Sequence, residues 1–199
     1  MHAFDFTKDY ILEDDRVLLR PLRTDDLEHL SHFGAEEPEI WRFSLVRAGG
    51  EGGMKRYLDI ALAGKADKKE YPFIVFDKKT QQYAGSTRFY DIQLSNQTLQ
   101  LGYTWYGKNF QGTGLNRHCK FLLLQFAFDE IGMLRVEFRA DKNNARSIAA
   151  MKAIGCTEEG ILRQNVPNPD GGRRDSMILS ILKSEWDDSV REMLRSKLT

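Results

Sequence analysis

The segment 111–128, QGTGLNRHCKFLLLQFAF, places Gly112 and Gly114 directly before an apolar pattern with the three- and four-residue spacing of a helix. The N-terminus of a helix offers unpaired backbone N–H groups and a partial positive charge. Glycines let an anion approach the backbone without a Cβ in the way. The sequence therefore predicts an anion cradle of the kind that holds phosphate groups. A glycine turn that merely connects two elements is the alternative interpretation.

Two common phosphate-binding motifs do not fit this loop. The pattern GxxxxGK[ST] of P-loops does not occur in the chain, and neither does the dinucleotide fingerprint GxGxxG. The strands predicted before the loop also form a meander, whereas the dinucleotide fingerprint requires a strand–helix–strand unit. A nucleotide triphosphatase and a Rossmann dehydrogenase are therefore both disfavoured.

The elements around the loop predict a mixed α/β (α+β) sandwich. Strands are predicted at 16–22, 71–77, 83–92, 99–106, 135–140, 157–166 and 174–182, from apolar, β-branched and aromatic runs bounded by turn residues. Helices are predicted from Thr24, at about 54–63, from Leu115 to Gly132, at 144–154 and from Ser184. This order lacks the regular alternation of a doubly wound sheet.

Composition indicates one globular domain over 1–199, with an N-terminal arm at 1–14 and a C-terminal helix at 184–199. The 29 basic and 29 acidic residues cancel, which disfavours nucleic acid as a partner. Cys119 and Cys156 fall in apolar segments without metal-ligand spacing, as expected for thiols in a reducing compartment. The N-terminus does not resemble a signal peptide, and no apolar run is long enough for a bilayer. We therefore expect a cytoplasmic protein without membrane contact.

Several segments, in this order, resemble the GNAT acetyltransferase superfamily and in particular its Rim-type branch. They are LGYTWYGKNFQGTGLN, FAFDEIGMLRVEFRADKNNARSIAAMKAIGCTEEGILR and DGGRRDSMILSILKSEW, within a match that covers most of 14–187. QGTGLN resembles the family's [R/Q]-x-x-G-x-[G/A] at Gln111 and Gly114, while Asn116 replaces the usual small residue. The branch includes enzymes that acetylate the N-terminal amine of ribosomal proteins and many small-molecule relatives. The resemblance implies the GNAT fold, a mostly antiparallel sheet splayed between its fourth and fifth strands, with helices on both faces.

The resemblance also implies acetyl-CoA as co-substrate and no metal. Backbone groups of the fourth strand would pair with the pantetheine arm, and the glycine loop would hold the pyrophosphate. The residues concerned are Thr104, Trp105 and Tyr106 on the strand, and Gln111, Gly112, Thr113, Gly114, Leu115 and Asn116 in the loop. His29 and His32 have a spacing that can share a metal, but no third ligand is evident.

Asn144 and Ser147 match the family's N-x-x-S at the start of the helix predicted at 144–154. The resemblance implies that the asparagine bonds the pantetheine and that the serine lies near the thiol. The alternative for Asn144 is the role of a helix N-cap.

Three positions at which the family often carries proton-handling residues differ here. Gln100 stands where many members have a glutamate base, Met151 where many have a tyrosine acid, and Val166 where one group of ribosomal enzymes has a glutamate. Glutamine cannot take a proton at neutral pH, although it can orient a water or an amine. The resemblance therefore leaves the general base undefined.

Two alternatives remain for the chemistry. Ser147 protonates the thiolate, as proposed for Rim-type relatives, with water removing the amine proton, or another residue such as Asp91 or Tyr103 reaches the site. The candidate catalytic residues are Ser147, Gln100 and Asn144, and the candidate substrate-binding residues are Trp41, Asp91 and Tyr103. Trp41 as a plain core residue is the alternative for that position. The glycine-rich stretch 47–53 either gates substrate or is an ordinary surface loop.

The sequence and the resemblance together predict an acetyl-CoA-dependent N-acetyltransferase. The acetyl group would move to a primary amine, of a protein N-terminus or of a small molecule, by direct attack in a ternary complex. A catalytically weak module that binds and senses acyl-CoA is the alternative, because three usual proton handlers are missing. The family often dimerises, so a homodimer is also an expectation.

Overall fold

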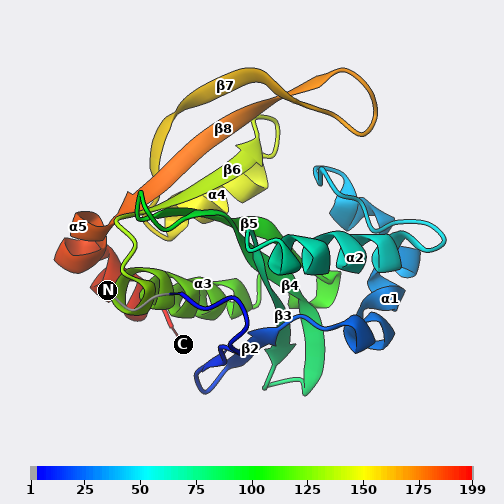
Figure 1. Cartoon of the computed structure of the whole chain (residues 1–199), viewed down its shortest axis with the longest axis horizontal. Coiled ribbons are helices and arrows are strands. Elements are labelled where there is room, and N and C mark those ends of the chain that lie inside the picture. The colour runs from blue at the N-terminus through cyan, green and yellow to red at the C-terminus, as the bar shows by residue number, and fades with distance from the viewer. Residues whose placement is uncertain (1–3, 199) are drawn as a thin grey trace.

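A computed structural model describes residues 4–198, and its centre is one eight-stranded sheet (Figure 1). The strand order is β1-β2-β3-β4-β5-β6-β8-β7, in which β5 and β6 are parallel and all other neighbours are antiparallel. The strands are β1 (Leu12–Glu13), β2 (Val17–Pro21), β3 (Tyr71–Asp77), β4 (Gln82–Gln93), β5 (Thr98–Tyr106), β6 (Arg135–Asp141), β7 (Thr157–Pro167) and β8 (Arg173–Leu182). The mixed α/β architecture agrees with the sequence-based expectation.

The helices flank this sheet. They are α1 (Leu27–Glu36), α2 (Gly53–Ala66), α3 (Leu115–Gln125), α4 (Ala145–Ala153), α5 (Lys183–Glu185) and α6 (Arg191–Arg195). Short turns are η1 (Thr24–Asp26), η2 (Pro38–Trp41) and η3 (Lys108–Phe110), and the π-helical turns are η4 (Phe126–Ile131) and η5 (Trp186–Val190). The long helix predicted from Leu115 is α3 continued by η4, and it ends at Gly132, whose φ of +82° suits the left-handed stop.

The segment predicted as an N-terminal arm, 1–14, contributes a short strand to the sheet. Leu12–Glu13 pairs with β2 as the two-residue strand β1, which shifts the family's fourth and fifth strands to β5 and β6. Phe4 is buried and its ring packs against Tyr71 and Phe126. Residues 1–3 of the predicted arm and the last residue of the predicted C-terminal helix lie outside the described residues.

Binary patterning explains how the elements pack. On β2 every second side chain is buried, and on α3 the side chains that recur at helical spacing are buried against the sheet. The fully buried members on α3 are Leu115, Cys119, Leu123 and Leu124. Burial of such a stripe provides most of a helix's stability, because an isolated helix of this length is marginal in water. In residues 4–198 no helix is both long and apolar enough to cross a membrane.

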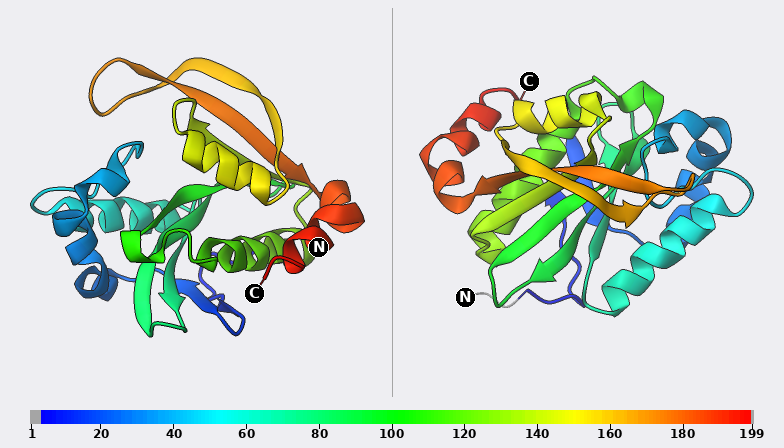
Figure 2. Two further views of the ribbon diagram at one scale, coloured as in Figure 1. Left: turned by 180° about the vertical axis from the view of Figure 1, so that it is seen from behind. Right: turned by 90° about the horizontal axis from the view of Figure 1, so that it is seen from above.

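The hairpin of β7 and β8 arches away from the rest of the sheet and reaches toward the connection between α1 and α2 (Figures 1 and 2). Arg47 in that connection donates from Nη1 and Nη2 to the carboxylate of Asp170 at the hairpin tip, at 2.6 and 2.5 Å. This ion pair joins segments 123 residues apart. The tip of the hairpin and the glycine-rich stretch 47–53 therefore lie side by side.

Candidate active site

The two central parallel strands separate after three residue pairs. β5 and β6 pair at Thr98–Arg135, Leu99–Val136 and Gln100–Glu137, and no further pair forms between them in the described chain. β5 nevertheless continues to Tyr106 and β6 to Asp141. The edge of β5 that faces β6 is thus open from residue 101 onward, and an extended ligand can add to such an edge by main-chain hydrogen bonds. This is the splay that the resemblance implied.

A bulge lies on the open part of β5. β4 and β5 pair at Ser86–Trp105 and Arg88–Gly102, so that Tyr103 and Thr104 together oppose the single residue Thr87. Tyr103 has a φ of +48°, which is uncommon for a residue with a Cβ. Bulges re-aim backbone groups and are frequent beside functional sites. The bulge and the open edge therefore coincide.

The side chains after the bulge are not available to a ligand. Trp105 is 5% exposed and its ring packs against Trp41 and Tyr57. Tyr106 is also buried, and its hydroxyl donates to Asn116 Oδ1 at 3.2 Å. Any contact that a ligand makes at Trp105 and Tyr106 must use the main chain, as the resemblance implied.

The glycine loop beyond β5 leaves open space at its two glycines. Gly112 and Gly114 have φ values of +76° and +88°, and an added Cβ at either residue would meet no atom of residues 4–198 within 4 Å. Gln111 Nε2 donates to Tyr106 O at 2.7 Å, and Thr113 Oγ1 donates to Phe110 O at 2.8 Å. These bonds fix the loop while its glycines face open space. The loop, placed at the first turn of α3, fits a phosphate-bearing ligand.

Two further residues, Leu115 and Arg146, lie next to the glycine loop. Leu115, the first residue of α3, is fully buried and holds the helix start against the core. Arg146 on α4 donates from Nη2 to Gln111 Oε1 at 2.7 Å, which places a guanidinium beside the loop. Sequence reasoning missed Arg146, although it lies inside the N-x-x-S motif. A cation there complements the negative charge of a phosphate.

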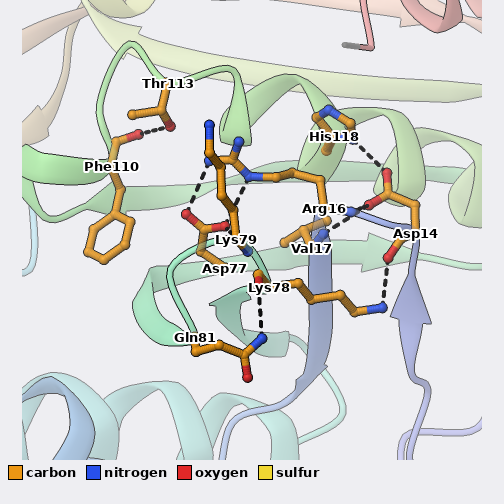
Figure 3. A network of polar contacts seen from close by, with 10 residues as sticks. All are labelled: Asp14, Arg16, Val17, Asp77, Lys78, Lys79, Gln81, Phe110, Thr113 and His118. Carbon is orange, nitrogen blue, oxygen red and sulfur yellow. Dashed lines mark hydrogen bonds and ion pairs between the residues drawn. The ribbon is translucent and has the colours of Figure 1, made fainter.

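A polar network anchors the first turns of α3 to the sheet (Figure 3). Asp14 Oδ2 lies 2.7 Å from His118 Nδ1, and Asp14 Oδ1 accepts from the backbone N–H groups of Arg16 and Val17. Arg16 in turn donates from Nε and Nη2 to the two carboxylate oxygens of Asp77. The network fixes the direction of α3, and hence the direction of the N–H groups at its start.

The N-x-x-S motif caps α4. Asn144 Oδ1 accepts a hydrogen bond from Ser147 N at 3.1 Å, which is the geometry of an N-cap. The cap uses the side-chain oxygen of Asn144, and Ser147 remains partly exposed. The helix-capping alternative therefore describes what Asn144 does within the protein, and its cofactor role remains a prediction.

At the point where β5 and β6 separate, Gln100 and Asp91 come together. Gln100 Nε2 donates to Asp91 Oδ2 at 2.7 Å, and Gln93 Nε2 donates to Asp91 Oδ1 at 2.9 Å. Asp91 has a φ of +47° at an irregular point of the β4–β5 ladder, while Gln100 is 6% exposed. A carboxylate from β4 thus reaches Gln100, the position at which the resemblance implied a glutamate base.

Glu137 is an acidic neighbour that sequence reasoning missed. It pairs with Gln100 across β5 and β6, and it accepts from Arg135 Nη2 at 2.9 Å and Arg139 Nε at 2.7 Å. The alternation of charged and apolar residues in RVEFRA was the available signal, because it puts these three side chains on one face. Glu137 is thus paired with two guanidinium groups, whereas the hydrogen bonds of the Asp91 carboxylate come from two side-chain amides.

Tyr103 is held by a buried cation. The Arg88 guanidinium lies 4.1 Å from the ring centroid of Tyr103 and 5.0 Å from that of Tyr57, and its Nη1 donates to Glu70 Oε2 at 2.5 Å. Burial raises the pKa of the Tyr103 phenol above its usual value. A phenol of raised pKa stays protonated at neutral pH, so Tyr103 can donate a hydrogen bond there but is a poor base.

Trp41, which was a candidate substrate-binding residue, and Met151 and Val166, which replace the family's usual proton-handling residues, make the following contacts within the protein. Trp41 is 1% exposed, and its Nε1 donates to Phe33 O at 3.3 Å, so it lies in the core, as its alternative interpretation held. Met151 is buried, and Val166 pairs with Arg174 in the hairpin. No cluster of three or more His, Cys, Asp or Glu side chains suited to a metal occurs in residues 4–198.

Comparison with known proteins agrees with this geometry. A family model described as an acetyltransferase (GNAT) domain matches residues 16–157. A Bacillus subtilis (strain 168) protein described as a probable N-acetyltransferase, YjcK, is 27% identical over 181 residues, covering 88% of this chain and 98% of that protein. The crystal structure of an acetyltransferase candidate from T. thermophilus is 30% identical with a TM-score of 0.87, and all of both chains is covered.

A more distant structure shares the fold. RimJ from Mycobacterium smegmatis, solved in complex with CoA-disulfide, is 19% identical with a TM-score of 0.77, covering 94% of this chain and 93% of that chain. The splayed sheet, the glycine loop at the start of α3 and the family match over residues 16–157 lead to one conclusion. The chain belongs to the GNAT acetyltransferase family.

Proposed function

We propose that this chain is an acetyl-CoA-dependent N-acetyltransferase that moves an acetyl group to a primary amine by direct attack in a ternary complex. The observation that supports it best is the continuity between the open edge of β5 and the glycine cradle at 111–116. An extended arm along the edge and a pyrophosphate in the cradle are the two parts of coenzyme A. The thioester supplies an activated acetyl group, and the chain's own residues must position it.

Each side of the splay has a separate role in this proposal. The main chain of Thr104, Trp105 and Tyr106 holds the arm, and the N–H groups at the start of α3, together with Arg146, hold the phosphates. On the other side, Asp91 takes the proton of the acceptor amine, directly or through a water held by Gln100. Donors that are already in position cost little reorganisation when charge develops.

The acceptor side favours a small amine over a protein N-terminus. The ion pair of Arg47 with Asp170 ties the tip of the β7–β8 hairpin to the stretch 47–53. In the proposed arrangement this connection bounds the acceptor side, which would then admit a small molecule more readily than a folded protein. Both cysteines are buried and unpaired, which supports activity in a reducing compartment such as the cytoplasm.

Thermal unfolding with acetyl-CoA, free CoA and ATP, each titrated, tests the cofactor first. A ligand that binds only the folded state stabilises it by about 2.7 kcal/mol at 100 times its Kd. We expect a rise of Tm with both forms of CoA and none with ATP. The absence of a shift with either form of CoA, in folded and ligand-free protein, would contradict the proposal.

A panel of amines then tests the reaction. Release of free thiol should require both acetyl-CoA and an amine, and mass spectrometry should find one added acetyl group on the amine. We expect small amines to be better acceptors than peptides that begin with a free amine. Binding of acetyl-CoA without turnover of any amine would instead favour an acyl-CoA-sensing module.

A further inference from the structure

A buried lysine lies under the gap between the splayed strands. Lys120 extends from α3 and is only 5% exposed. Its Nζ donates to Thr104 Oγ1 on β5 at 2.9 Å and lies 5.7 Å from the ring centroid of Phe138 on β6. Thr104 and Phe138 both lie beyond Gln100–Glu137, the last pair that joins the two strands. The amine is therefore located where the sheet is open.

The charge of this lysine has no counterion in the described chain. No carboxylate of residues 4–198 lies within salt-bridge distance of its Nζ. The positive charge of Lys120 interacts with two titratable groups, the thiols of Cys119 and Cys156. Burial raises the pKa of each thiol to about 12. Both thiols are thus neutral at physiological pH, and burial lowers the pKa of Lys120 to about 8.

Thr104 aims the amine. Its hydroxyl accepts from Lys120 and lies 2.7 Å from Thr87 Oγ1, so the side chain cannot turn away without losing both partners. A lysine that served only to fill space could be replaced by methionine at no electrostatic cost. An ammonium that is buried, oriented and unpaired instead suits a reaction that creates a negative charge nearby.

We propose that Lys120 donates the proton that the coenzyme A sulfur takes up as the acetyl group leaves it. This inference rests on the proposed function. The acceptor nitrogen forms the new C–N bond to the acetyl carbon, the C–S bond breaks, and its electron pair stays on sulfur. Lys120 Nζ supplies one proton to that sulfur and becomes a neutral amine. The acceptor nitrogen loses its extra proton to Asp91 or water, and Lys120 regains a proton from solvent.

The acidity of Lys120 suits this role. A thiol has an ordinary pKa of about 8.5, and proton transfer is most effective when donor and acceptor have similar pKa values near the working pH. Ser147 is the other candidate donor, but a serine hydroxyl carries no charge and releases its proton with difficulty. Lys120 both stabilises the thiolate by its charge and delivers the proton.

Three variants separate these contributions. Lys120→Met removes the charge and the proton from a side chain of similar shape, and Lys120→Arg keeps a charge that does not release its proton at accessible pH. Lys69→Met, at an exposed lysine in the turn before β3, is the matched control. Melting curves with acetyl-CoA establish for each variant that the fold and the cofactor site are intact.

The first readout does not depend on turnover. The ultraviolet absorbance of the thiolate is followed against pH for CoA bound to each variant. We expect the thiol of bound CoA to titrate at a lower pH in the wild type, Lys120→Arg and Lys69→Met than in Lys120→Met. Titration of the bound thiol at the same pH in the wild type and in Lys120→Met would overturn the inference, even if no acceptor amine were yet known.

The second readout is kcat against pH with both substrates saturating. The kcat of the wild type should fall at high pH as Lys120 deprotonates. The kcat of Lys120→Met should show no such fall at high pH. At pH 7 it should be at least tenfold lower than that of the wild type. Lys120→Arg should also be slow, because it cannot give up a proton. A wild type that neither binds CoA nor turns over would refute the proposed function itself, whereas equal kcat in wild type and Lys120→Met would refute only the role of Lys120.

Discussion

Gln100 on β5 and Glu137 on β6 form the last residue pair before the two parallel strands separate. Asp91 reaches the same point from β4 and bonds Gln100. A parallel pair that stops here leaves main-chain groups of β5 free beside a cluster of acidic and amide side chains. The proposed reaction would use both features, the free strand edge for one substrate and the acidic group for the other.

The cradle can be tested with a matched pair of glycine substitutions. Gly114→Ala should weaken acetyl-CoA binding at least tenfold, because the new methyl group would occupy the space above the loop. Gly132→Ala carries a similar backbone strain, since its φ is +82° and nothing lies within 4 Å of an added Cβ, but it stands at the far end of the helix. Calorimetric titration should find weaker binding only for Gly114→Ala, and equal affinities in the two variants would contradict the cradle.

Asp91→Asn tests the general base. The amide can still accept from Gln100 Nε2 but cannot take a proton from the acceptor, so kcat should fall by roughly 10²-fold, the lower range for loss of a general base. The affinity for acetyl-CoA should stay unchanged, because the Asp91 side chain bonds Gln93 and Gln100 and not the glycine loop. Asp67→Asn, at an exposed position after α2, is the control. Unchanged kcat in Asp91→Asn would leave water as the base.

The pair Arg47–Asp170 predicts how acceptor size is limited. Arg47→Asp should open the hairpin tip and improve kcat/KM for peptide acceptors relative to small amines. The double variant with Asp170→Arg should restore the wild-type ratio. Asp170 is 67% exposed, so the free energy of unfolding should change by less than about 1 kcal/mol. A ratio that is the same in all three proteins would show that the hairpin does not limit the acceptor.

Lys120 also predicts an unusual dependence of stability on pH. Burial lowers its pKa from 10.5 to about 8. Between these two pH values the unfolded chain binds more protons than the folded chain, so Lys120 makes the free energy of unfolding rise with pH. Below about pH 8 the cost of burying the charged amine lowers the free energy of unfolding by its full amount. Lys120→Met should therefore be more stable than the wild type at pH 7, by on the order of 3 kcal/mol. Urea unfolding at pH 7 and pH 9.5 should find a smaller difference at the higher pH, and a constant difference would contradict the shift.

The order of elements could be predicted because it depends on local patterns. Alternation defined the strands, three- and four-residue spacing defined α3, and Gly132 marked its end. β1 was missed because two residues carry no pattern of their own and form a strand only by pairing with β2. The π-helical turn η4 was missed because its residues share the apolar period of the helix that precedes it.

The site residues also divide into those that a local sequence pattern identifies and those that only folding brings together. The glycine loop and the N-x-x-S motif are contiguous in sequence, so their residue types and spacing sufficed to identify them. Gln100 was recognised only as a departure from the family's glutamate, since its partner Asp91 lies on another strand at a bulge that no local pattern indicates. Arg146 was missed because its bond to Gln111 spans 35 residues.

The sequence by itself determined the fold class, the position of the glycine loop before α3 and the family, because each depends on the properties of neighbouring residues. Only the tertiary structure decided that Lys120 is buried beneath the open strands, with no counterion among residues 4–198, and that Arg47 meets Asp170. Burial and charge pairing depend on groups that folding brings together from distant segments. The sequence neighbours of a helical lysine can be the same whether its side chain faces water or the gap in a sheet. Its acidity and reactivity differ because its tertiary contacts differ.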